Sequence, residues 1–520
     1  MIIKVANTKV EISKEWVLIL ILALFKLLIH FLTNTNYELH RDAFLYLALG
    51  DHLDFGYMSV PPSIAFFANI SRFLFGDSVF SIRLFPALIG AASVVMIGII
   101  VRELGGKLWA ILIACLAFIL SPAFLRSNTL FQPVSFNQFY WLLTGYFIVK
   151  LIQTKNPKFW IHLAITWGLA FLNKYSITFL ILGFLIALLL TSERRLLRSK
   201  YFIYAMAIGF LIILPNLIWQ YSHNWPVVTH MLQLQRTQLV NVDIIGFLMM
   251  QILMNLPGIF IWLLGLVYLL FHREGKRFNV LGYTFLLVVI ILILLRGKPY
   301  YTLGLYSILF AAGGVALEVY FRTRLYPLKY VLIAFMVITL LPVIPYSLPI
   351  LPFDKMAEYA KTSAGFGLSG PLIWEDGKMH HLPQDYADMT GWKELSDIVI
   401  STYQGLNPVE QTQCLIFAEN YGEAGAIMYH GKKQGIPEPI SLSDNFLIWA
   451  SDSINLKILI YVNDETRDIS YYFETIELMG KLTNTYARES GVPVYLCRNP
   501  RNEFEKFYVQ KVAQLKSRFH

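Results

Sequence analysis

The sequence predicts a polytopic α-helical membrane protein that carries a C-terminal α/β domain. The 520 residues are 56% hydrophobic and 15% charged, whereas soluble proteins have about a quarter of their residues charged. Apolar runs long enough for a bilayer core recur up to residue 350. Beyond it, short β-rich runs alternate with helix-compatible stretches, which is typical of an α/β layer domain. We therefore predict a membrane domain at residues 1–350 and a second domain at residues 351–520.

Each apolar run is assigned to one membrane span, because a bilayer core needs about 20 predominantly apolar residues per helix. Lys26 interrupts the first run and no small-residue cleavage site follows, so we interpret this run as a span and not as a signal peptide. The fifth and sixth spans are short and meet at the polar hinge Asn173–Ser176, which is typical of segments that line a cavity. The predicted spans are residues 16–33, 80–101, 108–125, 131–150, 159–172, 176–191, 201–219, 247–271, 280–296, 301–320 and 330–350.

The distribution of charge orients the chain, since short cytoplasmic loops collect Lys and Arg. Residues 1–350 hold 27 Lys+Arg against 12 Asp+Glu, and residues 351–520 hold 16 against 22. With the N-terminus inside, the odd number of spans places the C-terminal domain outside. Positive charge between apolar runs is membrane-flanking charge, so we expect no nucleic-acid partner. The charges on the predicted inner loops are Arg102, Lys107, Lys150, Lys155, Lys158, Arg194, Arg195, Arg198, Lys200, Arg273, Lys276, Arg277, Arg322, Arg324 and Lys329.

The main polar concentration of the membrane half is the predicted first outer loop, residues 34–79. Helix-like spacing of apolar residues after Asp42 predicts helices that lie on the outer membrane surface. Glu38 and Asp42 are one helical turn apart and are expected to share one face beside Arg41. The other acids of the loop are expected to be solvated charges or helix caps; they are Asp51, Asp54 and Asp77.

Few basic residues fall on the predicted outer side, which makes them informative. Lys174 lies in the hinge Asn173–Ser176, and Lys298 lies in the break Gly297–Tyr301. Aromatic neighbours and a restricted backbone would fix both ammonium groups, and a fixed cation at the membrane surface suits a lipid-borne phosphate. Three other outer cations are expected to snorkel toward lipid headgroups: Arg72, Arg83 and Arg236.

The C-terminal domain is predicted from its alternation of strands and helices. Cys414 and Cys497 fall on predicted strands and are interpreted as free thiols. Glu423 is interpreted as a structural acid at a helix start, and the glycines beside it as a strand-to-helix turn. The predicted strands are Cys414–Ala418, Lys457–Val462 and Val494–Cys497, and the predicted helices include Trp392–Tyr403 and Glu423–Gly431.

Carboxylates, isolated cations and a cleft between surface helices and short spans are thus expected on one side of the membrane. Transfer of a sugar from a polyprenyl phosphate needs all three. Cations stabilise the charge that develops on the leaving phosphate, and a carboxylate takes the proton from the acceptor hydroxyl. Because phosphate leaves readily as an anion, one carboxylate suffices, in contrast to glycoside hydrolysis, and a single displacement would invert the anomeric centre.

Residues Arg41–Leu53, continued by Phe55–Tyr57 and Val60–Pro62, resemble the first outer loop of bacterial integral-membrane glycosyltransferases related to dolichyl-phosphate-mannose protein mannosyltransferases. The resemblance implies the GT-C type of fold, with about 11–13 transmembrane helices in an aminoarabinose-transferase-like architecture. It covers nearly the whole chain, through Gly76–Ser78, Arg83–Leu84, Leu172–Ser176, Arg194–Arg198, Leu214–Gln220, His223–Pro226, Gly297–Tyr301, Gln384–Trp392 and Asn420–Ile427.

The resemblance implies that Asp42 is the catalytic carboxylate, because the family places its catalytic acid in the first outer loop. Two positions depart from the family pattern. Ala43 replaces the second acid of the loop motif. Ser135–Gln138 supplies amides where the family often has an acid after the third span. The identity of the donor and the acceptor is therefore left open.

The remaining candidate residues are assigned from their predicted outer position and from the resemblance. Arg41, Lys174, Arg296 and Lys298 would bind the donor phosphate. Neither a metal site nor a certain cofactor is predicted, although the first-loop carboxylates could bind a divalent cation. The possible substrate-binding residues are Glu38, His52, Tyr57, Tyr300, Tyr301, Asp385 and Asp388.

The sequence as a whole predicts a multi-pass protein of the bacterial inner membrane, with a cytoplasmic N-terminus and a periplasmic C-terminal domain. It would transfer a sugar from a polyprenyl-phosphate donor to an envelope lipid, glycan or protein, with membrane lipids as further partners. Two alternatives stay open. One is a flippase or transporter for the same lipid, and the other is an inactive scaffold of the same fold.

Overall fold

The computed structural model describes residues 2–5, 8–11, 13–321, 327–467 and 469–517. Arg322 and Arg324, two of the predicted inner-loop charges, lie outside these residues. The chain divides into two compact units. Unit 1 comprises Met1–Asn34, Arg83–Leu217 and Gln235–Ile350, and unit 2 comprises Thr35–Ile82, Ile218–Leu234 and Leu351–His520. Residues 351–520 therefore pack with two earlier segments, and the predicted division into domains at residue 350 stays a prediction.

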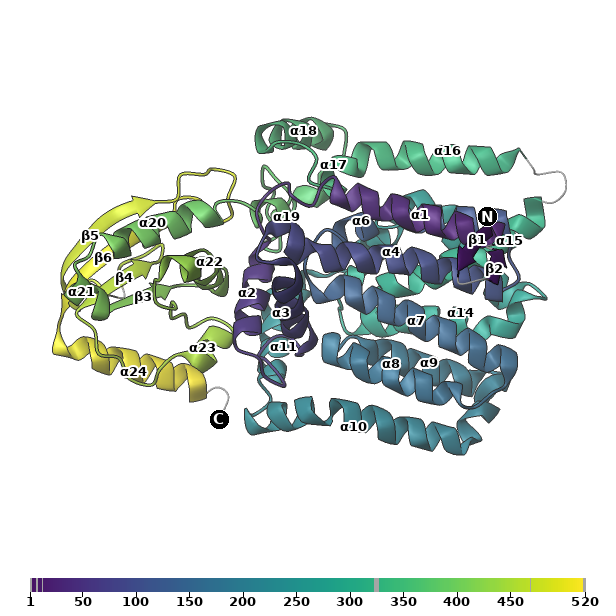
Figure 1. The fold of residues 1–520 in the computed structure, drawn as a ribbon, viewed down its shortest axis with the longest axis horizontal. Coiled ribbons are helices and arrows are strands. Elements are labelled where there is room, and N and C mark those ends of the chain that lie inside the picture. The colour runs from purple at the N-terminus through teal and green to yellow at the C-terminus, as the bar shows by residue number, and fades with distance from the viewer. Residues whose placement is uncertain (1, 6–7, 12, 322–326, 468, 518–520) are drawn as a thin grey trace. The chain divides into compact units, whose positions relative to one another are not determined.

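Unit 1 is helical apart from an N-terminal hairpin, in which β1 (Ile2–Val5) pairs antiparallel with β2 (Thr8–Glu11). Its longer helices run side by side (Figure 1). The α-helices of this unit, short ones included, are α1 (Lys14–Phe31), α4 (Val79–Glu103), α5 (Leu108–Ile119), α6 (Pro122–Ser127), α7 (Pro133–Thr154), α8 (Phe159–Asn173), α9 (Ile177–Leu190), α10 (Lys200–Ser222), α12 (Ile244–Leu253), α13 (Ile259–Phe271), α14 (Asn279–Leu294), α15 (Leu303–Phe321), α16 (Leu328–Leu340) and α17 (Ile344–Ser347). Short 3-10 helices join several of them: η1 (Ser192–Arg198), η2 (Leu239–Asn241), η3 (Leu256–Gly258), η4 (Gly275–Phe278), η5 (Pro299–Thr302) and η6 (Leu341–Val343).

All eleven predicted spans fall on helices of the structure. By length and apolar composition, five described helices can cross a membrane, or seven if each of two bent pairs is one span. In the bent pairs, α9 meets η1 at 113° and α12 meets the segment Leu256–Phe271 at 75°. The predicted polar hinge is confirmed, because α8 ends at Asn173 and α9 begins at Ile177. The helices α5 and α8 are shorter, with 12 and 15 residues.

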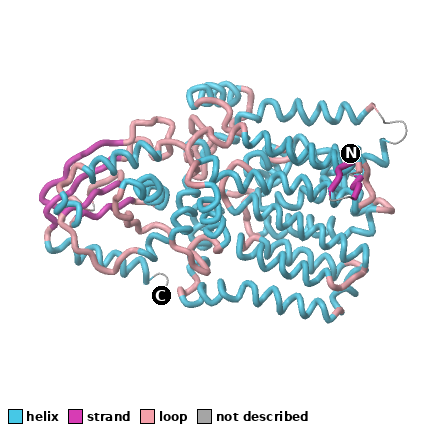
Figure 2. Tube along the Cα trace, viewed as in Figure 1, coloured by secondary structure: helices cyan, strands magenta, loops and turns pink. Residues whose placement is uncertain are grey.

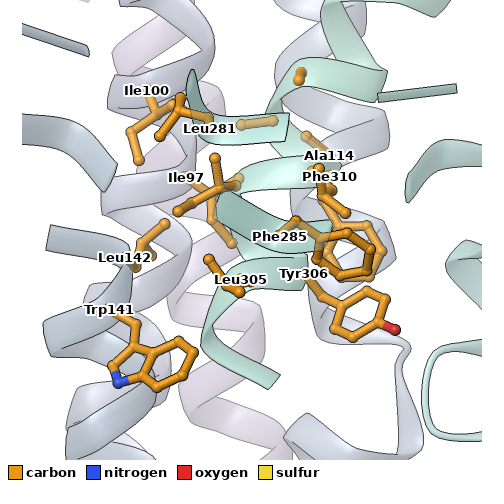
Figure 3. Packing of buried hydrophobic residues seen from close by; sticks show 14 of the residues in the cluster. Ile97, Ile100, Ala114, Trp141, Leu142, Leu281, Phe285, Leu305, Tyr306 and Phe310 are labelled. Atoms are coloured by element: carbon orange, nitrogen blue, oxygen red, sulfur yellow. The ribbon is translucent and has the colours of Figure 1, made fainter. Parts of the chain in front are cut away.

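The core of unit 1 is an apolar interior shared by α4, α5, α7, α14 and α15, part of which is shown in Figure 3. There Ile97 of α4, Phe285 of α14 and Phe310 of α15 lie among the buried side chains. Two glycines explain how closely α13 and α15 approach. A Cβ on Gly265 would overlap the carbonyl oxygen of Leu309, and a Cβ on Gly313 would overlap that of Ile261. Small residues of this kind let membrane helices pack backbone to backbone.

Unit 2 contains a four-stranded mixed sheet in the order β3-β4-β6-β5 (Figure 2). The strands are β3 (Cys414–Ala418), β4 (Ile458–Val462), β5 (Phe473–Lys481) and β6 (Pro493–Pro500). β3 and β4 are parallel, and the other pairs are antiparallel. The predicted strands are confirmed, and so are the free thiols of Cys414 and Cys497. β5 was not predicted because it is a mostly exposed edge strand, in which only Phe473 is buried, so its sequence lacks an apolar pattern.

The helices of unit 2 are listed in chain order: α2 (Arg41–Asp51), α3 (Ser63–Phe75), α11 (Pro226–Thr237), α18 (Phe353–Gly365), η7 (Gly370–Leu372), α19 (Gln384–Ala387), α20 (Trp392–Gln404), α21 (Pro408–Thr412), α22 (Tyr421–Gly431), η8 (Lys432–Gln434), α23 (Asn445–Trp449) and α24 (Asn502–Lys516). The predicted helices of the first loop are thus present as α2 and α3. Helix α2 is buried from Ala43 to Gly50 and packs against both α3 and α22.

The glycines near Glu423 have a different role from the predicted one. Gly422 and Gly425 lie within α22 and not in a strand-to-helix turn. A Cβ on Gly422 would lie 2.6 Å from Cγ of Arg41, and a Cβ on Gly425 would lie 2.9 Å from the backbone of Phe44. Both glycines therefore allow α22 to approach the backbone of α2, and the prediction of a turn was wrong because it treated local conformation as the only use of glycine.

Candidate active site

Asp42 lies in the first turn of α2 with its carboxylate partly accessible. The side chain is 29% exposed. The hydroxyl of Tyr421 donates a hydrogen bond of 2.9 Å to Oδ1. Burial, followed by the charge of Asp42, raises the pKa of Tyr421 well above its ordinary value, so this hydroxyl keeps its proton and acts as a donor. The carboxylate is held by one defined donor and still reaches the surface of unit 2.

Arg41 precedes Asp42 and lies over the same tyrosine. Its guanidinium carbon is 4.5 Å from the centroid of the Tyr421 ring, which is a cation–π distance. Its backbone N–H donates to the carbonyl of Asp388 at 2.9 Å. Its Nε is buried and has no hydrogen-bond acceptor among the described residues. The predicted pair of Arg41 and Asp42 is therefore present, with Tyr421 between the two side chains.

His40 is the N-cap of α2, and three carboxylates surround its imidazole. Nδ1 accepts a hydrogen bond of 3.1 Å from the backbone N–H of Asp42 and lies 3.9 Å from Oδ2 of the same residue. Nε2 faces Asp385 at 3.6 Å and Asp388 at 3.7 Å. The imidazole is 5% exposed. Two of the predicted substrate-binding acids, Asp385 and Asp388, thus lie close to Asp42 with His40 between them.

Asp388 is the most buried acid of this cluster. Its side chain is 3% exposed, and NH1 of Arg488 lies 3.3 Å from both carboxylate oxygens. Burial raises the pKa of Asp388, while the charges of His40, Arg488 and Arg41 oppose this shift. Its carboxylate oxygens face Arg488 and His40 of the protein itself. Asp385, in contrast, is 43% exposed.

The spacing of Glu38 and Asp42 predicted that they share one helix face, and this prediction was wrong. The helix begins at Arg41, so Glu38 precedes it. The carboxylate instead accepts the backbone N–H groups of Gly391 at 3.2 Å and Lys393 at 3.0 Å, at the start of α20. Burial raises the pKa of Glu38, and these backbone donors partly offset it. Glu38 is therefore a helix-capping acid.

His52 and Tyr57 lie away from this cluster of charges, elsewhere in unit 2. Nε2 of His52 is 3.2 Å from Oε2 of Glu438, and its ring lies 4.3 Å from that of Trp449. Tyr57 is fully buried, and its hydroxyl contacts the carbonyls of Leu49 and His52. Burial raises the pKa of Tyr57 to about 12. The hydroxyl of Tyr57 is occupied by the backbone of its own loop.

Glu423 is a structural acid, as predicted. Asn420 and Glu423 form a capping box, in which the Asn420 side chain accepts the N–H groups of Gly422 and Glu423. The Glu423 carboxylate accepts the N–H groups of Glu419 at 3.0 Å and Asn420 at 3.3 Å. This arrangement satisfies the free N–H groups at the start of α22.

A further carboxylate near Asp42, Asp444, was not predicted. It is the N-cap of α23 and has φ of 49° and ψ of −142°, a conformation that costs a non-glycine residue about 1–3 kcal/mol. Burial raises the pKa of Asp444, and the charge of His230 and a hydrogen bond from Ser59 oppose the shift. The charge of Asp42 contributes to the raised pKa of Asp444, and the charge of Asp444 contributes to the raised pKa of Tyr421. The sequence carries no signal for this residue, because only the tertiary fold brings it near Asp42.

In unit 1, the structure brings Lys174 together with the tyrosines of the second polar break. Its ammonium lies 5.9 Å from the ring centroid of Tyr300 and 5.4 Å from that of Tyr301. The two rings meet edge to face at 4.9 Å. The side-chain amide of Gln251 donates to the carbonyl of Pro299 at 3.2 Å and fixes this break. The predicted aromatic setting of Lys174 is therefore confirmed.

Arg296 directly precedes the same break, and Lys298 lies within it. Arg296 is exposed, has φ of 52°, and its NH1 donates to the carbonyl of Val240 at 3.4 Å. Lys298 is the N-cap of η5. Lys174, Arg296 and Lys298 thus belong to unit 1, whereas Arg41 and Asp42 belong to unit 2.

Two cations that were expected to snorkel toward lipid have protein partners instead. Arg72 contacts Asp51 at 2.7 Å and Asp77 at 2.6 Å in unit 2. Arg83 is 1% exposed, and its NH1 donates to the carbonyl of Asn34 at 3.0 Å. These predictions were wrong because they considered each cation alone, whereas the fold of the first loop brings acids and a backbone carbonyl to the two guanidinium groups. The same ion pairs show that Asp51 and Asp77 are not freely solvated loop charges.

The described part of the chain contains no group of three or more His, Cys, Asp or Glu side chains placed to hold a metal ion. The cluster around His40 has three acids, but their charges are directed at imidazole and guanidinium groups. We therefore build no catalytic step on a metal.

The fold and this site define a helical membrane protein whose second unit presents two partly exposed carboxylates, Asp42 and Asp385, beside the buried His40 and Asp388. Comparison with solved structures gives the type of fold. The crystal structure of ArnT from Cupriavidus metallidurans bound to undecaprenyl phosphate aligns with a TM-score of 0.64 at 14% identity, over 93% of this chain and 98% of that chain. The apo structure of the same protein aligns equally well, at 13% identity. The predicted fold class is confirmed.

Comparison of sequences gives the relatives. Residues 59–219 match the family described as dolichyl-phosphate-mannose-protein mannosyltransferase. The lipid A galacturonosyltransferase RgtD of Rhizobium johnstonii is 30% identical over 193 residues, which are 36% of this chain and 40% of that protein. Over these parts of its length the chain is thus similar to dolichyl-phosphate-mannose-protein mannosyltransferases and to a lipid A galacturonosyltransferase, as its motifs predicted, and it is a multi-pass membrane protein.

Proposed function

We propose that the protein is an inverting glycosyltransferase that moves a sugar from a polyprenyl-phosphate donor to an envelope lipid, glycan or protein. The observation that carries this proposal is Asp42, a carboxylate that is partly exposed and held by Tyr421 at the start of α2. The relatives support a transferase and do not favour the flippase alternative. The ArnT structure with bound undecaprenyl phosphate supports the class of donor.

Asp42 acts as the general base in this proposal. The acceptor oxygen or nitrogen forms a bond to the anomeric carbon while the bond from that carbon to the phosphate oxygen breaks. The proton of the acceptor moves to Asp42, and polyprenyl phosphate leaves as an anion. A single displacement of this kind inverts the anomeric centre. A positioned base of this type contributes about 10²–10⁴-fold to the rate.

In unit 1, we assign Lys174, Arg296 and Lys298 to the donor phosphate; in unit 2, Arg41 carries the same assignment from the sequence. Lys174 is held over Tyr300 and Tyr301, so its ammonium is ordered before a ligand arrives. Arg41 is fixed over Tyr421, and its buried Nε is available as a donor. Arg296 precedes the break Gly297–Tyr301, and Lys298 lies within it. Ordered cations stabilise the charge that develops on the leaving phosphate.

The remaining roles follow from the sequence. Asp385 is exposed near Asp42 and is proposed to contact the acceptor, with Asp388 behind it. Glu38 and Tyr57 are held by backbone groups and His52 lies beside Glu438, so we assign none of the three to the substrate. The basic inner loops support a cytoplasmic N-terminus in the bacterial inner membrane and a periplasmic site. The domain division at residue 350 is part of the same proposal.

The proposal is tested with purified protein in lipid vesicles and a labelled polyprenyl-phosphate sugar. We expect label to appear in an acceptor fraction from the envelope, with the anomeric configuration opposite to that of the donor. Movement of the donor across the vesicle membrane without any product would instead identify a flippase. Tight donor binding without product from any acceptor would identify an inactive scaffold.

A further inference from the structure

The N-cap of α2 is unusual in the chemistry of its side chain. Most helix N-caps are Ser, Thr, Asp or Asn, none of which changes its hydrogen-bond acceptor near neutral pH. Here the cap is His40, and its Nδ1 accepts the backbone N–H of Asp42 at 3.1 Å. An imidazole nitrogen accepts a hydrogen bond only when it carries no proton. The cap therefore assigns the neutral form of His40, with its proton on Nε2.

The groups around the ring fit this assignment. An Nε2–H group points toward Asp385 at 3.6 Å and Asp388 at 3.7 Å. Both carboxylates lie on or next to α19, and Arg488 faces Asp388 from the other side. Arg41 and Asp42 are the charged groups on the helix that His40 caps. His40 is thus enclosed by three acids and two arginines, and it connects the start of α2 with residues 385–388.

Protonation of the ring would change the contact with Asp42. A proton on Nδ1 removes the acceptor for the Asp42 N–H and places a new donor 3.9 Å from Oδ2 of Asp42. The imidazolium would then bind the carboxylate that is proposed to accept a proton from the substrate, and it would lower the basicity of that carboxylate.

We propose that His40 is a positioning residue that holds Asp42 in its reactive arrangement only while the imidazole is neutral. This inference rests on the proposed function of Asp42 and adds a regulation of the same site by pH.

The upward shift of the pKa of His40 supports a change in the protonation of its imidazole near neutral pH. Burial lowers this pKa, but the facing carboxylates of Asp385, Asp42 and Asp388 raise it, with a net shift upward from the ordinary value. The ordinary value is about 6.5. Loss of activity on the acid side is therefore expected at a higher pH than titration of an ordinary carboxylate would give.

The test is the pH profile of kcat/KM for wild type, His40→Asn and the control His380→Asn. Asparagine keeps an N-cap acceptor but does not titrate. We expect the acid limb of His40→Asn to move down by at least about one pH unit, while its rate at pH 8 stays close to wild type. His380, which stacks on Trp374 and pairs with Asp376 in the same unit, should leave the profile unchanged. An unshifted limb in His40→Asn, or an equal shift in His380→Asn, overturns the proposal.

Two further measurements keep the proposal testable. If His40→Asn does not fold, Asp385→Asn serves, because loss of a facing carboxylate lowers the pKa of His40 and moves the acid limb down; an unmoved limb overturns the proposal. In ¹⁵N-histidine NMR of the full chain at pH 8, we expect a bare Nδ1 and a protonated Nε2 for His40. A protonated Nδ1 and a bare Nε2 at pH 8 would overturn the proposal for His40, whether or not sugar transfer is detected. Absence of sugar transfer from every donor tried would count against the proposed function alone.

Discussion

Two helix starts in unit 2, those of α2 and α22, carry an acid in the first turn but use it differently. At α22 the cap is Asn420, and the Glu423 carboxylate accepts backbone N–H groups within its own turn. At α2 the cap is His40, and the Asp42 carboxylate accepts the hydroxyl of Tyr421, which comes from α22. The comparison shows that one acid is bound by backbone N–H groups of its own turn and the other by a side chain of a different helix. A stable helix start needs only the first arrangement.

The largest expected effect is on Asp42. Asp42→Asn keeps the shape of the side chain but removes the base, so turnover should fall about 10²–10⁴-fold, with the melting temperature close to that of wild type. The measurement is the initial rate of transfer from a labelled polyprenyl-phosphate sugar. Glu423→Gln is the matched control at the other helix start, because glutamine preserves the capping box, and its turnover should resemble wild type.

The next effect concerns the hydroxyl that joins the two helix starts. Tyr421→Phe removes the donor to Asp42 and keeps the ring under Arg41. We expect kcat to fall about tenfold, because hydrogen bonds to charged groups contribute roughly 1.5–3 kcal/mol. Unchanged kcat would show that Tyr421 does not hold the base.

A smaller effect is expected from the cation of unit 1. Lys174→Ala should raise the KM for the donor about tenfold, a cost of about 1.4 kcal/mol, and change kcat less. Lys200→Ala is the control, since Lys200 also lies near a tyrosine ring, that of Tyr201 at 6.0 Å. The same KM in Lys174→Ala and wild type would contradict a role for Lys174 in binding the donor phosphate.

The smallest expected effect is on stability. Burial, with the charges of Glu489 and Glu419, raises the pKa of Glu423 well above its ordinary value. The folded protein therefore binds this proton more tightly than the unfolded chain does. The free energy of unfolding should fall as the pH rises from about 4.3, the ordinary value, through the raised pKa. Glu423→Gln should lose this part of the slope in thermal unfolding from pH 4.5 to 8, and an unchanged slope would contradict the interpretation.

Local features of the site could be predicted from the sequence, whereas long-range contacts could not. Asn420 and Glu423 have the spacing of a capping box, so this setting follows from neighbouring residues. The polar breaks at Lys174 and at Tyr300–Tyr301 could each be predicted, but the contact between them could not. The fold class follows from composition and apolar runs. Glu38 was misplaced because helical spacing predicts a shared face only where the helix extends that far, and α2 starts at Arg41.

The network around His40 could not be predicted, because its partners lie about 345 residues further along the chain, at Asp385 and Asp388. Tyr421 and Asp444 are equally distant from Asp42. Arg72 and Arg83 show the same limit, since their partners depend on how the first loop folds back. From the sequence alone, charged side chains of this kind are expected at the surface. Only the tertiary fold shows that they have partners and are buried.

The most direct test of the account is the ratio of turnover between Asp42→Asn and Glu423→Gln, measured at one temperature on equal amounts of folded protein with the same labelled donor. The account predicts a ratio below about 10⁻², because only one of these acids accepts a proton from the acceptor. A ratio near one, with both variants as active as wild type, would contradict the assignment of Asp42 as the base.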